Sequence, residues 1–234
     1  MDQDAADESS IVLNSVKSSN IPLQEKTDIL EFAGAAYILR AEEEDDGRLL
    51  FGKKFWFETM ALRDESTIKK MLTQFSEWVR NKCEIDEFTA MEELFQDLEI
   101  GGNLSIASYK LEALLVIDRI GSRILPGPHP YFLRQVVVHA SNQIENPTIR
   151  VDMLMLSLEM FQLGQWKLNS EWAGEIVCDA IVWIVASFNE LLNLPVNHPA
   201  RLTFVWVMKF CAVCPICNLN CFNTQLLKGF LGLH

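Results

Sequence analysis

The amino-acid sequence predicts an all-α protein. Apolar residues recur at helical spacing along most of the 234 residues, and 49% of the chain is hydrophobic, which is enough for a substantial core. Signals for strands are nearly absent. The one Asp-Gly pair, Asp46-Gly47, lies within an acidic run, where a hairpin turn is not expected. We therefore expect helices joined by turns, without a sheet.

The first part of the chain is expected to begin as a tail and to continue as helices. Residues 1–22 are acidic, rich in serine and weakly periodic, which is typical of a flexible tail. A helix is expected over Glu25–Arg40, before the acidic run Glu42–Asp46. Two amphipathic helices follow, and Gly101-Gly102 ends the second. Their apolar stripes are Ile68, Met71, Leu72, Phe75, Trp78 and Val79, and Phe88, Met91, Leu94, Phe95 and Leu98.

Five more helices are expected, over Ser105–Ile120 (ending at Gly121), Tyr131–Ile144, Ile149–Leu163, Ile176–Leu194 and Leu202–Val213. The last three are apolar on nearly all sides, which predicts that they are covered by the rest of the chain or by a partner. Polar residues interrupt the last two, at Asp179, Asn189, Glu190 and Lys209. Neither has the ~20 unbroken apolar residues that a bilayer requires, so we expect no membrane insertion.

The charge of the chain is divided unevenly. Residues 1–100 carry 23 acidic and 11 basic side chains, whereas residues 101–234 carry 9 of each. We expect one helical domain over residues 23–234, with an acidic half, 23–102, and an apolar, repeat-like half, 103–234. Because the negative charge repels phosphate, nucleic acid and anionic lipid are not expected as direct partners.

The acidic half has two interpretations. It either keeps the protein soluble or docks the basic surface of another protein. The candidate contact residues for docking are Glu42, Glu43, Glu44, Asp45 and Asp46, although a run of like charges is most simply a solvated loop. The nearby aromatic residues Phe55, Trp56 and Phe57 are further candidates if they are exposed, but we expect them to belong to the core.

Two helix entries in the second half follow one pattern. They are Asn146-Pro147-Thr148-Ile149-Arg150 and Asn197-His198-Pro199-Ala200-Arg201, in which asparagine is the expected N-cap of the first and proline opens the helix. Over about residues 105–210 the chain resembles HEAT and armadillo-type repeats, although the two prolines are 52 residues apart, longer than the ~40–47 of such repeats. The resemblance implies stacked antiparallel helical pairs. An irregular helical bundle is the alternative.

No catalytic motif is present in the sequence. It has no phosphate-binding glycine loop, no G-x-S-x-G elbow and no H-E-x-x-H pair. His129 lies between two prolines and is expected in a turn, and His139 is expected to be a packing or surface residue of a helix and not a catalyst. We therefore predict neither an enzyme nor a cofactor, although a site assembled from scattered residues is not excluded by the sequence.

Four cysteines near the C-terminus are the strongest metal candidate. Cys211, Cys214, Cys217 and Cys221 have the spacing C-x2-C-x2-C-x3-C, which suits an iron–sulfur cluster or zinc. Against this, Phe222 follows where ferredoxin loops have proline. The four cysteines also share one face of a continuing apolar helix, as packing residues would. We predict packing, and keep a metal-binding module as the alternative function.

The preferred function from sequence is a non-enzymatic scaffold that binds a protein partner within a complex. That complex is obligate if the apolar C-terminal helices are covered by the partner. The chain begins Met1-Asp2-Gln3-Asp4 without a secretory signal, which predicts a cytoplasmic or nuclear protein with reduced cysteines. It ends Leu231-Gly232-Leu233-His234 without a polar cap, as expected for a fragment, a short isoform or half of a complex.

Overall fold

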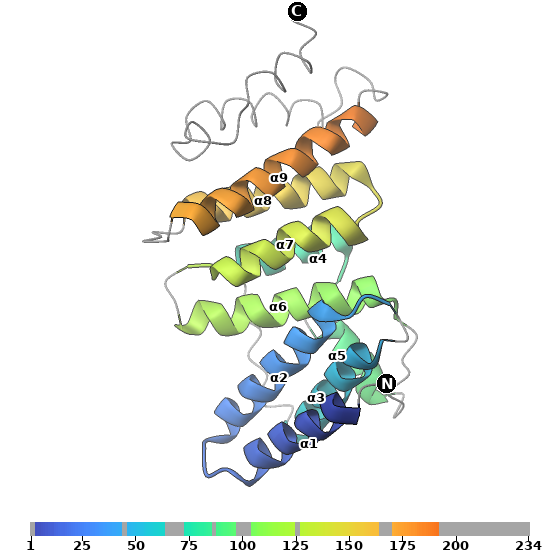
Figure 1. Cartoon of the computed structure of the whole chain (residues 1–234), viewed down its shortest axis with the longest axis vertical. Helices are drawn as coiled ribbons and strands as arrows, with labels where there is room; N and C mark the ends of the chain where they lie inside the picture. The colour runs from blue at the N-terminus through green and yellow to red at the C-terminus, as the bar shows by residue number, and fades with distance from the viewer. Residues whose placement is uncertain are drawn as a thin grey trace, which may run out of the picture. The chain divides into compact units, whose positions relative to one another are not determined.

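The computed structural model describes residues 3–43, 46–63, 73–85, 88–96, 104–124, 127–163 and 170–191. Every regular element among them is an α-helix, which confirms the all-α prediction for this part of the chain (Figure 1). The helices are α1 (Gln3–Ser18), α2 (Leu23–Arg40), α3 (Gly47–Leu62), α4 (Gln74–Cys83), α5 (Thr89–Gln96), α6 (Ile106–Ile124), α7 (Pro130–Gln143), α8 (Pro147–Leu163) and α9 (Ser170–Leu191). None of these helices is long and apolar enough to cross a bilayer.

The chain forms two compact units. The first unit is residues 1–126 and holds α1 to α6, and the second is residues 127–234 and holds α7 to α9. Helix α6 packs against α2, and its residues 111–120 are all buried. That helix also runs through Gly121 to Ile124, past its expected end.

The expected flexible tail contains a helix. Residues 3–18 form α1, and its Leu13 packs in a small core with Leu30 of α2 and Phe55 of α3. Lys17 near its end pairs with Glu58 of α3. These contacts come from segments distant in the sequence, so the weak periodicity of residues 1–22 does not reveal them.

Two glycines allow α2 and α3 to lie close together (Figure 1). A Cβ atom added to Gly34 would lie 2.5 Å from Cδ1 of Trp56, and one added to Gly52 would lie 2.4 Å from Cγ1 of Ile38. Both distances are below any normal contact, so neither position has room for a side chain. The Trp56 ring fills the space beside Gly34 and donates its Nε1–H to the carbonyl oxygen of Glu31 at 3.1 Å.

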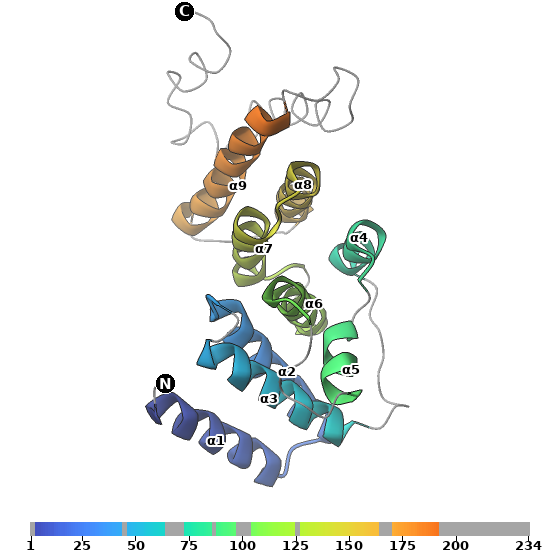
Figure 2. The same ribbon diagram turned by 90° about the vertical axis from the view of Figure 1, so that its right-hand side faces the viewer.

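In the second unit α7, α8 and α9 each pack against the other two (Figure 2). The α7–α8 turn confirms the predicted cap: Asn146 Oδ1 accepts from the N–H of Thr148 at 2.9 Å, and Pro147 opens the helix. Arg150 then donates to the carbonyl oxygens of Ile144, at 2.9 Å, and Glu145, at 3.2 Å. The Arg150 side chain, which belongs to the first turn of α8, thereby fixes the preceding α7–α8 turn.

Candidate functional site

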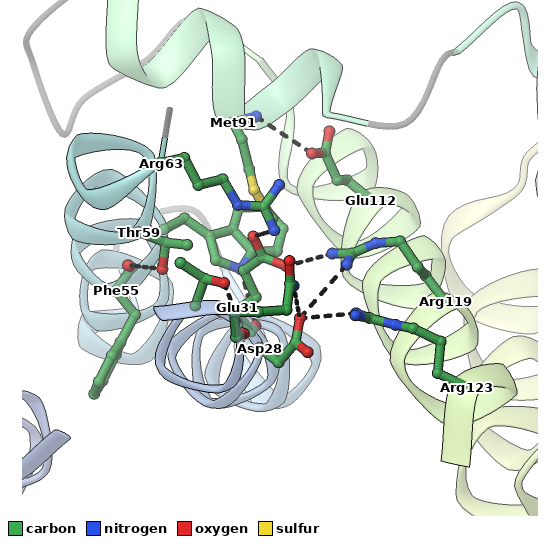
Figure 3. A network of polar contacts seen from close by, with 12 residues as sticks. Asp28, Glu31, Phe55, Thr59, Arg63, Met91, Glu112, Arg119 and Arg123 are labelled. Atoms are coloured by element: carbon green, nitrogen blue, oxygen red, sulfur yellow. Dashed lines mark hydrogen bonds and ion pairs between the residues drawn. The ribbon is translucent and has the colours of Figure 1, made fainter. Parts of the chain in front are cut away.

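Five charged side chains gather inside the first unit (Figure 3). Asp28 and Glu31 come from α2, Arg63 follows the end of α3, and Arg119 and Arg123 come from α6. We call these five residues the ion cluster. Buried charges of this kind are candidates for a functional site.

Glu31 is the centre of the ion cluster. Its side chain is completely buried, and its two oxygens pair with different guanidinium groups, Oε1 with Arg63 and Oε2 with Arg119. The two arginine side chains are themselves only 7% and 5% exposed. Burial lowers the pKa of Arg63, and the charge of Glu31 opposes that effect. One buried carboxylate thus links the end of α3 to the middle of α6 through α2.

Asp28 lies one helical turn from Glu31, nearer the protein surface. Its Oδ1 accepts from Nη2 of Arg123 at 2.7 Å and lies 3.8 Å from Nη1 of Arg119. The Asp28 and Arg123 side chains are 21% and 34% exposed, so this pair lies at the edge of the interior. Exposed pairs of this kind stabilise little, and the energetic weight of the cluster therefore lies at Glu31.

The Phe88 ring lies against both buried guanidinium groups. Its centroid is 4.9 Å from Cζ of Arg63 and 5.1 Å from Cζ of Arg119. Phe88 has φ of +75°, a left-handed conformation that costs a bulky residue on the order of 1–3 kcal/mol. Cation–π attraction to two desolvated arginines offsets part of that cost. This conformation begins α5, where the buried carboxylate of Glu112 accepts from the N–H of Ala90 at 2.5 Å.

The ion cluster is arranged to hold helices together. Both oxygens of Glu31 are occupied by arginines, and its enclosure leaves no approach for a substrate to that carboxylate. A general base or nucleophile needs a reacting atom within hydrogen-bond reach, and Glu31 is buried away from any such atom. Removing one partner of such a buried pair is costly because it leaves a charge without its counter-charge. The chemistry of the cluster is therefore that of a clamp between α2, α3, α5 and α6.

Asp118 is a second buried carboxyl group, on α6. The residue is 4% exposed, and burial raises its pKa to about 6, although hydrogen bonds from the side chains of Thr73 and Ser122 act in the opposite direction. Thr73 is the N-cap of α4, where its Oγ1 also accepts from the N–H of Ser76 at 3.0 Å. Asp118 therefore anchors the start of α4 on α6, and its pKa makes that contact sensitive to pH.

The acidic run has a structural role where it is described. Asp46 is the N-cap of α3: it accepts from the N–H of Arg48 at 2.8 Å and from the N–H of Glu42 at 3.0 Å. Burial would raise the pKa of Asp46, but these hydrogen bonds outweigh it and lower the pKa. Arg48 also pairs with Glu42, at 3.9 Å. Glu42 and Glu43 are exposed, whereas Glu44 and Asp45 lie outside the described residues.

The aromatic and histidine candidates are mostly internal. Phe55 and Trp56 are buried in the core, as expected, and Phe57 is half-buried. His129 is the N-cap of α7, with its Nδ1 accepting from the N–H of Tyr131 at 3.1 Å. His139 is buried within α7, which agrees with the packing alternative and excludes the surface one.

The metal candidate cannot be placed, because Cys211, Cys214, Cys217 and Cys221 lie outside the described residues. Within the described ranges, no three His, Cys, Asp or Glu side chains are grouped to hold a metal ion. Cys83 is a free thiol, whereas Cys178 of α9 is disulfide-bonded.

Sequence reasoning missed the ion cluster. A signal for it does exist, because Asp118-Arg119 interrupts the apolar run that ends Leu114-Leu115-Val116-Ile117, and Glu31 lies beside buried Leu30. Charged residues on the buried face of a helix must be paired, so these positions predict a buried ion pair. Their partners are not predictable in the same way, since Glu31 and Arg119 are 88 residues apart.

Comparison with known proteins finds no matching family model, no matching curated protein and no matching solved structure.

Proposed function

We propose that the chain is a non-enzymatic helical scaffold that binds a protein partner through α2. The observation that carries this proposal is an exposed apolar stripe on that helix. Ile29 and Phe32 are 43% and 42% exposed, and the exposed, charged Glu25 and the half-buried Ala36 extend this side at helical spacing. We call Glu25, Ile29, Phe32 and Ala36 the α2 stripe.

The other sides of α2 are occupied. Leu30 packs towards α1 and α3, Gly34 lies against Trp56 of α3, and Glu31 faces Arg119 of α6. The α2 stripe lies on a side of the helix other than the one formed by these buried residues. Ile29 and Phe32 offer exposed apolar surface that a partner's side chains can cover. Because their helix is already packed in the protein, binding costs little conformational entropy on this side.

The partner is proposed to combine apolar residues with a basic rim. Glu25 opens the α2 stripe, and residues 1–100 carry 23 acidic against 11 basic side chains. Complementary charge speeds association and orients the partner, while the apolar contacts supply most of the affinity. An amphipathic helix with lysine or arginine beside its apolar face meets both requirements.

The architecture proposed for this scaffold is the stacked helical pair. The pair α7–α8 supports it: a short turn joins the helices, Asn146 caps α8, and Arg150 holds the turn. These are the residues in which the chain resembles HEAT and armadillo repeats. The ion cluster of the first unit fits the same role, because its charges hold helices in place.

Affinity purification with mass spectrometry tests the proposal, using the tagged full chain and two variants. Phe32→Asp places a charge in the α2 stripe. Leu50→Asp is the matched control, since Leu50 of α3 is 46% exposed but lies outside the stripe. We expect a stoichiometric partner that Leu50→Asp retains and Phe32→Asp loses, with both variants as helical as the wild type by circular dichroism.

Salt dependence tests the charge of the partner separately. A partner with a basic rim should associate more slowly as ionic strength rises from ~0.05 to ~0.5 M, because screening shortens the reach of the acidic surface. Equal recovery of the partner by Phe32→Asp and Leu50→Asp would contradict the assignment of the α2 stripe. An association rate independent of salt would contradict the basic rim alone.

A further inference from the structure

Helix α1 lies against an apolar patch that α2 and α3 form together (Figure 2). Leu30 of α2 and Phe55 of α3 are buried in this patch, and Ala33, Tyr37 and Leu62 pack around them. The rings of Tyr37 and Phe55 are stacked, with 5.8 Å between their centroids. We call Leu30, Ala33, Tyr37, Phe55 and Leu62 the α1 seat.

Few contacts hold α1 on the α1 seat. Within residues 10–18, whose side chains the structure describes, Leu13 is the one buried apolar side chain, and Val16 is half-buried. Lys17 pairs with Glu58 of α3, but these side chains are 35% and 29% exposed, and exposed ion pairs stabilise little. A helix that buries so little apolar surface detaches more often than the core of its unit opens.

The sequence of α1 makes it a weak helix when it is detached. Its 16 residues include four serines and three β-branched residues, all of which have low helix propensity, and an isolated helix of this length is marginal in water. Its charge also opposes docking. Residues 1–18 carry four acidic side chains and one basic one, and residues 19–100 carry 19 acidic and 10 basic. A more basic helix is therefore better suited to this acidic unit.

We propose that α1 is a detachable cover of the α1 seat and that an amphipathic helix of a protein partner takes its place. Helix α1 shows which side chains the α1 seat accepts, namely a leucine, an apolar residue three positions later and then a lysine, at Leu13, Val16 and Lys17. The partner helix has this pattern and a net positive charge. The α1 seat and the α2 stripe share no residue, so the inference goes beyond the proposed function and does not depend on it.

Hydrogen exchange of the wild-type full chain measures the detachment of α1. Deuterium uptake is followed by mass spectrometry and corrected for the intrinsic rates of the amides. We expect residues 11–18 to exchange at least about 100-fold faster than residues 30–38 of α2, because α1 opens without the rest of its unit. Equal protection of the two segments would overturn the proposal, since α1 would then open only together with α2.

Binding of a peptide to two full-chain variants tests whether the α1 seat accepts a helix from outside. The probe is a fluorescent peptide with the sequence of residues 1–20. Leu13→Asp removes the buried leucine of α1, and Ile11→Asp, at a position that is 64% exposed, is the matched control. We expect the peptide to bind Leu13→Asp at least about tenfold more tightly than wild type or Ile11→Asp, in which the attached α1 competes at high effective concentration.

Two controls accompany this measurement. Residues 30–38 of Leu13→Asp should keep their wild-type hydrogen exchange, which shows that the α1 seat is still folded. A peptide that itself carries Leu13→Asp should not bind. Equal affinity of the wild-type peptide for all three proteins, or no binding to a folded Leu13→Asp, would overturn the α1 seat as an exchangeable site.

The chemistry of the partner is tested with the same peptide after Asp4, Asp7 and Glu8 are each replaced by lysine. We expect this basic peptide to bind Leu13→Asp at least about tenfold more tightly than the original at ~0.05 M salt, with a smaller gain at ~0.5 M. No gain would contradict a basic partner. Light scattering tests the other occupant: a wild-type dimer that Leu13→Asp does not form would assign the α1 seat to a second copy and overturn the partner helix.

Discussion

Replacing Asp118 with asparagine should stabilise the protein at neutral pH. Asp118 is 4% exposed, and burial raises its pKa from 3.8 to about 6. The ionised carboxylate is therefore less favourable in the folded protein than in the unfolded chain. The difference between the two pKa values corresponds to about 3 kcal/mol.

The sign of the pH dependence follows from the direction of the pKa. Since the folded pKa lies above the unfolded one, the protonated carboxyl stabilises the folded state below about pH 4, and this stability is lost as pH rises through about 6. Asparagine does not titrate, so the variant lacks this loss. It also keeps one acceptor oxygen for Thr73 and Ser122, and losing the other costs about 1 kcal/mol at every pH.

Chemical denaturation followed by circular dichroism measures the effect, in steps of about one pH unit from ~4 to ~8. The free energy of unfolding of Asp118→Asn minus that of the wild type should rise by about 2.5 kcal/mol over this range, leaving the variant about 2 kcal/mol more stable at neutral pH. Glu77→Gln, at an exposed position on α4, is the control. If the difference for Asp118→Asn stays constant with pH, the carboxyl group is not desolvated and the reasoning fails.

Two further substitutions test the packing of the first unit. Glu31→Gln should lower the free energy of unfolding by about 3–5 kcal/mol, because it removes the buried negative charge that Arg63 and Arg119 share; a loss below about 1 kcal/mol in denaturation would contradict the clamp. Gly52→Ala should cost about 1–3 kcal/mol, because the new Cβ would lie 2.8 Å from the carbonyl oxygen of Gly34. Gly47→Ala, whose nearest neighbour would be 3.9 Å away, should be neutral or stabilising. Equal melting temperatures for the two alanine variants would show that α2 and α3 do not pack closely.

Helix content and several helix ends were predictable because their causes are local. The apolar spacing of residues 131–144 and 149–163 predicted α7 and α8 to within two residues, since one face of each must be covered. Asn146 and Pro147 identified the start of α8 because an asparagine side chain satisfies the N–H groups of the first turn. The same argument was available for Asp46 at the start of α3, but the acidic run was interpreted as a solvated loop.

The candidate site was far less predictable. The sequence places charges within apolar stretches but does not say which charges meet. Phe88 was assigned to an apolar stripe, and its positive φ and its two cationic neighbours are visible only in the structure. The acidic run Glu42–Asp46 was a candidate for docking a partner, and within it Asp46 caps the start of α3.

By itself, the sequence determined that this chain folds into helices, that its acidic charge lies in the first hundred residues, and that Asn146 starts a helix. These properties depend on neighbours within a turn or two. Only the tertiary structure decided that residues 3–18 form a packed helix, that α6 belongs with the acidic half, and that Glu31 joins Arg63 and Arg119. The physical reason is range: burial and charge pairing bring together residues up to 95 positions apart, and such contacts leave no period in the sequence.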